Sequence, residues 1–404
     1  SPLFNGNTSL YSNFINTNGE HFFNQTYENS KWDLAAEATK EAIEAAIAQG
    51  VSMYYFTETM PDYDKNNSQY EFIRNQYDNR YAITDPWNSE LLWGNSSPVT
   101  NGQYWQIQSP AMMKDPSSSS VEAAWQWLAP SLRMAETYYT KNGLPIDEDL
   151  SFAYSERYRI ATIAFNQRFY AQFANRTAKL NLNREPRFYA SLGFDRGLNR
   201  TWGGLWKLKM RKGETHGRRA NTGDYLVTGY ALKKLVHQDS EGDTYNKAIT
   251  YPWPMIRLSE LYLMYAESLN ESSGPSLEVY DALNEIRQRA GIPSVQDAWS
   301  NATFAATPNK HLSQEGLREI IQQERMIELA FEGHRYYDIR RWKLAEKYFT
   351  TPIKGWSVDE DSEANYYQIM EVSQRSFRSP RDYFQPISFT ELSRNPNLIQ
   401  NPGW

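Results

Sequence analysis

The sequence predicts a mostly helical protein in which helical hairpins pack against a loop-rich half with a few short strands. Apolar residues recur at helical spacing in residues 29–50 and 251–350. Between them, residues 51–230 are rich in Pro, Asn, Ser, Gly and aromatic side chains and keep no lasting period. With 404 residues, 40% of them hydrophobic, the chain can bury a sizeable core, and we expect one domain over 1–404.

The first helix is expected over Asn29–Gly50. Ser30 can cap its start, with Asp33 three positions further on, and Gly50 ends it. Small residues such as Ala42 line one face, so a partner helix can approach closely. This pattern is typical of helical-hairpin repeats.

The last third of the chain predicts four helices. The first two are separated at Gly274 and Pro275, and Gly291 with Pro293 ends the second. The apolar positions of the first are Leu258, Leu261, Tyr262, Tyr265 and Leu269, and those of the second are Leu277, Tyr280, Leu283 and Ile286. The others are expected at 313–331 and 336–348. Such pairs indicate stacked hairpins of the tetratricopeptide kind, although a repeat of about 34 residues is not regular.

Regular elements are expected at three places in the loop-rich half. Val121–Lys141 and Tyr154–Asn175 are predicted as helices. Residues Arg187–Leu192 alternate between polar and apolar side chains, which predicts a strand.

Composition narrows the function classes. The chain has no cysteine, so disulfides, thiol catalysis and cysteine metal sites are excluded within it. Its net charge is -6 and it has no Lys/Arg run, so no nucleic-acid partner is expected. No apolar stretch approaches the roughly 20 residues of a membrane span, and no signal peptide is visible. Because the chain opens abruptly at Ser1, we expect further residues before it.

The 13 Trp, 28 Tyr and 18 Phe are an unusually high aromatic content, which can fill helix–helix interfaces or form a binding surface for flat ligands. Most are expected to pack in the core, but several lie in loops. An indole face can stack on the C–H face of a sugar ring, while guanidinium and amide groups bind its hydroxyls. The predicted ligand-binding residues are Trp87, Trp93, Trp105, Trp202, Trp206, Arg218, Asn221 and Asp224. For any single tryptophan, local packing is the commoner role. Trp125 and Trp342 lie in periodic segments and are expected in the core.

Catalytic and metal-binding patterns are weak, and no cofactor is expected. Asp62–Asn66 begins like a calcium loop, but Asn67 and Ile73 replace the glycine and the glutamate that such a loop needs. The five histidines lack metal-ligand spacing. Glu324, Glu328, His334 and Asp338 form a charged block, but interleaved arginines favour a structural ion-pair network. We expect the same of Arg257 with Glu260 and Glu267.

Four blocks of the C-terminal part resemble the SusD/RagB family, in the expected order. They are Tyr251–Glu267 (YPWPMIRLSELYLMYAE), Leu283–Gly291 (LNEIRQRAG), Glu324–Trp342 (ERMIELAFEGHRYYDIRRW) and Arg394–Trp404 (RNPNLIQNPGW). The likeness is weaker over 186–230 and looser before that. Relative to the family, we expect that an N-terminal portion with a lipidated cysteine is missing from this sequence.

The resemblance implies a surface lipoprotein of the outer membrane of Bacteroidetes-type bacteria, on its extracellular face. Such proteins lie over a SusC-like TonB-dependent transporter and deliver oligosaccharides, or in some members peptides, into it. Their fold places tetratricopeptide repeats on one side and a ligand-binding, loop-rich half on the other. The resemblance therefore predicts a binding protein and not an enzyme.

Three alternatives stay open at this stage. A RagB-like protein would bind a peptide, for which an open groove with backbone hydrogen-bonding groups is more suitable. A glycoside hydrolase would need two carboxylates that face each other across a sugar, and no pair stands out among the 48 Asp and Glu. A structural lid on the transporter would need no ligand at all.

Overall fold

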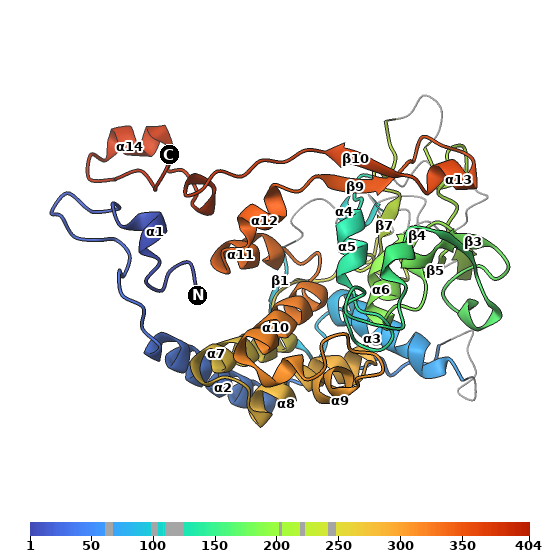
Figure 1. Ribbon diagram of the computed structural model, residues 1–404, viewed down its shortest axis with the longest axis horizontal. Coiled ribbons are helices and arrows are strands. Elements are labelled where there is room, and N and C mark those ends of the chain that lie inside the picture. Colours follow the sequence, from blue (N-terminus) through green and yellow to red (C-terminus); the bar gives the residue numbers. More distant parts are fainter. Residues whose placement is uncertain are drawn as a thin grey trace.

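The computed structural model describes residues 1–60, 68–97, 104–107, 109, 125–201, 204–218, 223–240 and 248–404. Within them the fold is mostly helical, and strands occur as two-stranded antiparallel pairs, so the predicted fold class is confirmed. In Figure 1 the long helices α2, α7, α8 and α10 gather at one side, and most of the short strands lie at the opposite end.

The helical side is built on α7 (Leu258–Ser273). This helix packs against α2 (Ser30–Ala48), α8 (Leu277–Ala290) and α10 (Gln314–Glu328). The predicted hairpin of α7 and α8 is confirmed: Gly274 and Gly291 both have positive φ, where glycine avoids the steric cost of a Cβ. Leu263, Leu283 and Ile320 are among the buried residues of the shared core. A short helix, α9 (Val295–Ser300), completes this side.

The expected helix over 336–348 is two shorter ones, α11 (His334–Arg341) and α12 (Ala345–Phe349). Lys343 has a φ of 63°, a left-handed conformation that interrupts the helix. The turn between α10 and α11 holds Phe331 and Gly333, both also at positive φ. Buried residues of the N- and C-terminal segments, such as Tyr11 and Tyr383, pack against α11 and α12.

Helices and strand pairs make up the other half of the molecule. The helices are α3 (Tyr70–Thr84), α5 (Leu132–Thr137), α6 (Pro186–Ser191) and the single-turn α4 (Tyr104–Ile107) and α13 (Glu363–Tyr366). The strand pairs are β1 (Leu91–Asn95) with β8 (Trp253–Arg257), β2 (Ile160–Thr162) with β3 (Arg176–Ala178), β4 (Leu192–Phe194) with β7 (Tyr230–Leu232), β5 (Leu198–Thr201) with β6 (Gly204–Lys207), and β9 (Ile353–Trp356) with β10 (Ile369–Ser373). Two short helices, α1 (Thr8–Tyr11) and α14 (Phe389–Arg394), lie near the termini.

Three local predictions in this half were wrong or only partly right. Tyr154–Asn175 holds no α-helix but two 3-10 turns and strand β2, and the Ile163 N–H donates to Asn175 across the β2–β3 connection. Arg187–Leu192 is mostly helix α6. The alternation of polar and apolar residues does not indicate a strand here, because polar and apolar side chains are all buried. Pro186 at the first helical position favours a helix instead. Within Val121–Lys141 the described helix is only Leu132–Thr137.

The charged block of α10 and α11 is a buried ion-pair network, as predicted. Its pairs include Arg187 with Glu185 and Glu324, Arg257 with Glu90, Glu328 and Glu332, Arg287 with Glu324, Arg289 with Glu90 and Glu328, Arg325 with Asp338, and Arg341 with Glu267. Arg257, Glu260 and Glu267 also belong to ion pairs, as predicted, but not with one another: Glu260 pairs with Arg325, and Glu267 with Arg341. Arg257 has extended backbone before α7 begins, so its side chain does not lie on the helix face of those glutamates.

Two further features concern the described part of the chain, a cluster of metal-binding side chains and a membrane-spanning helix. There, no group of three or more His, Asp or Glu side chains could hold a metal ion. Asp62–Asn66, which begins like a calcium loop, lies outside the described residues. None of the described helices is long and apolar enough to cross a bilayer.

Candidate ligand-binding site

Three of the predicted tryptophans lie around the β1–β8 strand pair. Trp93 of β1 pairs with Ile256, and Trp253 of β8 pairs with Asn95. The ring of Trp105 packs edge-on against Trp253 at a centroid distance of 5.6 Å, and its indole N–H donates to the Tyr251 hydroxyl at 3.2 Å. We call Trp87, Trp93, Trp105 and Trp253 the tryptophan ribbon.

Two members of the ribbon are unusually exposed. Trp87 is 64% and Trp93 61% exposed, whereas tryptophans of folded proteins are highly buried on average. The Trp87 ring lies beside Gly94 of β1, 3.4 Å from the position that a Cβ would take there. Trp87 itself has a φ of 56°, a strained conformation for a bulky residue. The ribbon thus presents two flat apolar faces to solvent.

A second aromatic group surrounds Trp127. This indole is 57% exposed, lies 5.0 Å from the Trp125 ring, and donates its N–H to Asp224 at 2.7 Å. Arg218, also predicted for ligand binding, lies 4.4 Å from the Tyr225 ring centroid and forms an ion pair with Asp359. Asp224 therefore orients an indole, and Arg218 already has a carboxylate partner.

The remaining predicted residues have other positions. Trp206 is only 6% exposed, belongs to the main core cluster and stacks on His216, so it offers no face to a ligand here. Trp202 and Asn221 lie outside the described residues. Trp342 is buried as expected, but Trp125 lies in a non-helical segment and is partly exposed.

Sequence reasoning overlooked Trp127 and Trp253. Trp127 lies three residues before Pro130 in a segment that was predicted as helix, so its exposure was not expected. Trp253 lies within the most recognisable block of the chain, which favoured a scaffold role. The position of two tryptophans close to Pro130 is the sequence signal that could have indicated the exposure of Trp127.

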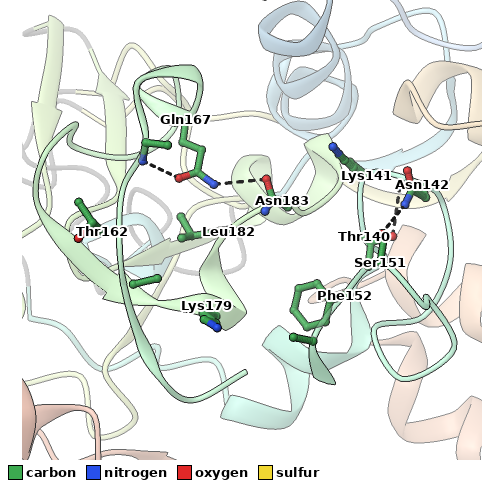
Figure 2. A pocket seen from close by; sticks show the side chains of 13 residues that line it. Thr140, Lys141, Asn142, Ser151, Phe152, Thr162, Gln167, Lys179, Leu182 and Asn183 are labelled. Atoms are coloured by element: carbon green, nitrogen blue, oxygen red, sulfur yellow. Dashed lines mark hydrogen bonds between the residues drawn. The ribbon is translucent and has the colours of Figure 1, made fainter. Parts of the chain in front are cut away.

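A separate polar pocket lies in the same half of the molecule. It has a volume of about 400 Å³ and is lined by Thr140, Lys141, Asn142, Ser151, Phe152, Ala153, Ala161, Thr162, Ala164, Gln167, Lys179, Leu182 and Asn183. Figure 2 shows Gln167 and Asn183 joined by a hydrogen bond on one side, and Asn142 bonded to Ser151 on the other. Planar amides and hydroxyls of this kind suit the hydroxyl groups of a sugar.

Residues 89–404, which include the ribbon strands and the ion-pair network, match the family model described as the SusD family. The chain belongs to the SusD family. Members of this family are binding proteins and not enzymes, and they are typically surface lipoproteins.

Curated relatives of the chain are SusD-like proteins of Formosa agariphila. SusD-like protein P2 is 36% identical over 150 residues, which are 37% of this chain and 25% of that protein. SusD-like protein P25 is 33% identical over 147 residues, 36% of this chain and 23% of that protein. The matches thus span about a quarter of the relatives' length.

Solved structures share the fold over nearly the whole chain. The structure of BT4246 superposes with a TM-score of 0.81 at 29% identity, covering 100% of this chain and 68% of that one. A SusD-like protein of Bacteroides fragilis, BF3747, superposes with a TM-score of 0.59 at 20% identity, covering 98% of this chain and 76% of that one. The second likeness concerns the fold alone.

Proposed function

We propose that this chain captures an oligosaccharide at the cell surface and passes it to a SusC-like TonB-dependent transporter of the outer membrane. The observation that carries the proposal is the pair of exposed indoles, Trp87 and Trp93, on the tryptophan ribbon. Membership of the SusD family supports a binding role and a position at the extracellular face.

The physical argument concerns stacking and release. Each indole that stacks on a sugar face contributes on the order of 1 kcal/mol beyond the apolar area it buries. Two or three such contacts, less the cost of association, give affinities of about micromolar to millimolar. A carrier that must release its ligand to a transporter needs an affinity in this range.

The experiment is calorimetry of the purified chain against a panel of neutral and acidic oligosaccharides, with peptides as the competing class. Trp93→Ala and Trp87→Ala should each weaken oligosaccharide binding by about fivefold, since one stacking contact is lost. Phe389→Ala is the matched control, because Phe389 is also an exposed aromatic but lies on α14. Peptide binding without oligosaccharide binding would instead support the RagB-like alternative.

The transporter partner needs its own test. Co-purification of the full-length protein with a SusC-like transporter of the same organism should succeed with the wild type. It should also succeed with Trp93→Ala, since ligand stacking and transporter docking use different surfaces in this proposal. If uptake of the bound oligosaccharide is unchanged in Trp87→Ala and Trp93→Ala, the protein is a structural lid.

A further inference from the structure

A second cavity lies where the helical side meets the β9–β10 pair. It has a volume of about 450 Å³, within the ordinary range of roughly 300–1,000 Å³ for small-molecule pockets. Its walls come from α5, the end of α10, the α10–α11 turn, α11, α12 and the segment after β10. The lining residues are Ser131, Arg133, Met134, Met326, Ala330, Phe331, Gly333, Arg335, Tyr336, Ile339, Tyr348, Phe349 and Arg375.

Three arginines from distant parts of the chain converge on this cavity, which we call the arginine pocket. The guanidinium of Arg335 lies 4.8 Å from the centroid of the Tyr348 ring, and that of Arg133 lies 5.4 Å from the same ring. The guanidinium of Arg375 lies 5.1 Å from the Phe349 ring. The three guanidinium groups therefore lie close to only two aromatic rings, those of Tyr348 and Phe349.

No described carboxylate forms an ion pair with Arg133, Arg335 or Arg375, in contrast to the arginines of the buried network. Arg335 donates to the sulfur of Met326 at 3.0 Å, which is a weak acceptor. Arg375 donates through Nη2 to the Tyr348 carbonyl at 2.9 Å, but its Nε is buried and has no hydrogen-bond partner among the described residues. Arg335 and Arg375 therefore have N–H groups that can still donate hydrogen bonds to a ligand in the pocket.

The electrostatics agree with the geometry. Burial lowers the pKa of the Arg335 guanidinium, Tyr348 opposes this effect, and the nearby Arg133 and Arg375 lower the pKa further. Burial and Arg133 lower the pKa of Arg375 in the same way. Like charges that repel one another cost folding free energy, and an anion in the pocket would offset this cost more fully than the aromatic rings do.

The wall of the pocket is also strained. Phe331 has a φ of 69°, which is a genuine outlier for a bulky side chain. Its ring packs against the apolar cluster of Tyr251, together with Trp105 and Trp253 of the tryptophan ribbon. Strain of this kind persists where the surrounding structure over-determines it, and it clusters at ligand sites. The same residue thus connects the arginine pocket with the ribbon.

We propose that the arginine pocket binds the acidic group of a saccharide, either a carboxylate or a sulfate ester. Guanidinium groups match the geometry of such oxyanions and donate to them in pairs, while Tyr348 and Phe349 contact the ring that carries the anion. The inference rests on the proposed oligosaccharide function and narrows its ligand from saccharides in general to acidic ones.

The test compares three saccharides of matched length by calorimetry: a neutral, a uronic-acid-containing and a sulfated oligosaccharide. At least one acidic saccharide should bind about tenfold or more tightly than the neutral one, since each charge-assisted hydrogen bond adds affinity. This preference should shrink as salt is raised, because the pocket is open to solvent and its charges are screened. The difference between the two acidic saccharides identifies the anion.

Arg335→Gln and Arg375→Gln should each weaken binding of the acidic saccharide by about tenfold and leave the neutral one unchanged. Arg394→Gln is the matched control, because it makes the same charge change at an exposed arginine that is paired with Glu391 on α14. The melting temperatures of Arg335→Gln and Arg375→Gln should stay level or rise, since repulsion is relieved. A structural role would instead lower them.

The outcomes separate the two proposals. Equal binding of neutral and acidic saccharides overturns the arginine pocket but leaves the oligosaccharide function intact. If no saccharide binds, both proposals fail. Tighter binding of an acidic peptide than of any acidic saccharide overturns the saccharide assignment, and a melting temperature that falls with each Arg→Gln change overturns the pocket as a ligand site.

Discussion

The Nη1 atom of Arg257 lies 2.7 Å from Oε1 of Glu328, and both side chains are 2% exposed. Arg257 also pairs with Glu90 and Glu332, so one guanidinium compensates three buried carboxylates. Without it, Glu90 and Glu328 keep only other arginines and Glu332 keeps Lys234, so the buried network carries excess negative charge, which costs about 3–5 kcal/mol. We expect Arg257→Gln to lower the free energy of unfolding by about this amount in urea titrations.

The control for this experiment is Arg394→Gln, which removes an exposed arginine and should change stability by less than about 1 kcal/mol. Glu328→Gln should cost less than Arg257→Gln, since Arg257 keeps Glu90 and Glu332. An effect of Arg257→Gln no larger than that of the control would contradict the view that this network holds the core.

Acid should destabilise the protein through the same network. Burial raises the pKa of Glu332, but Arg257 and Lys234 outweigh this and lower the pKa to about 2. Because the folded-state pKa lies below the unfolded value of about 4.3, this stabilisation is present above that value and is lost as the pH falls toward 2. Urea midpoints should drop steeply between about pH 4.5 and 2, and Glu332→Gln should reduce that slope.

Asp78 should act in the opposite direction at milder pH. Burial raises its pKa to about 6, although the hydrogen bond from the Phe56 N–H and the positive charge of Arg74 both act to lower it. The folded state then takes up a proton before the unfolded state does, so Asp78 favours folding increasingly as the pH falls from about 7 to 4. We expect Asp78→Asn to flatten this part of the stability profile. A profile unchanged by the substitution would show that Asp78 stays ionised.

Gly291, at the end of α8, has a φ of 69°, and a Cβ there would lie 1.8 Å from Nδ2 of Asn75. Gly291→Ala therefore combines left-handed strain of about 1–2 kcal/mol with displacement of Asn75. Gly50→Ala isolates the first cost, because Gly50 also has positive φ but no atom within 4 Å of its Cβ position. Thermal unfolding should show a larger loss for Gly291→Ala than for Gly50→Ala.

Because the Trp127 indole donates a hydrogen bond to Asp224, we expect two substitutions of Asp224 to weaken ligand binding to different extents. Asp224→Ala frees the indole, so its fluorescence should change and oligosaccharide binding should weaken by about threefold to tenfold. Asp224→Asn keeps an acceptor oxygen and should retain most of the affinity. If both variants bind as the wild type does, Trp127 does not contact ligand.

Local patterns predicted the helical side well. The period of Asn29–Gly50 corresponds to α2, and the break at Gly274 and Gly291 corresponds to the ends of α7 and α8. The same reasoning failed at Tyr154–Asn175, where strand pairing and turns replace the expected helix. Helix signals are short-range, whereas strand pairs depend on a partner elsewhere in the chain.

The candidate site was predicted only in part. Trp87 and Trp93 have the exposure expected of them, but Trp206, chosen on the same grounds, is in the core. A loop-rich composition indicates that a tryptophan lies outside a periodic helix. It does not indicate which elements cover its face, and for Trp206 the cover comes from His216 and the core.

The sequence by itself determined the family, the helical class and the ends of α2, α7 and α8, because periodicity, caps and recognisable blocks are encoded within a few turns of chain. The tertiary structure alone decided that Arg257 meets Glu90 and Glu332 rather than Glu260, and that Arg133, Arg335 and Arg375 share one cavity. These contacts join residues up to 242 positions apart, from Arg133 to Arg375, and nothing local constrains such pairings. They depend on how the packed elements orient their side chains.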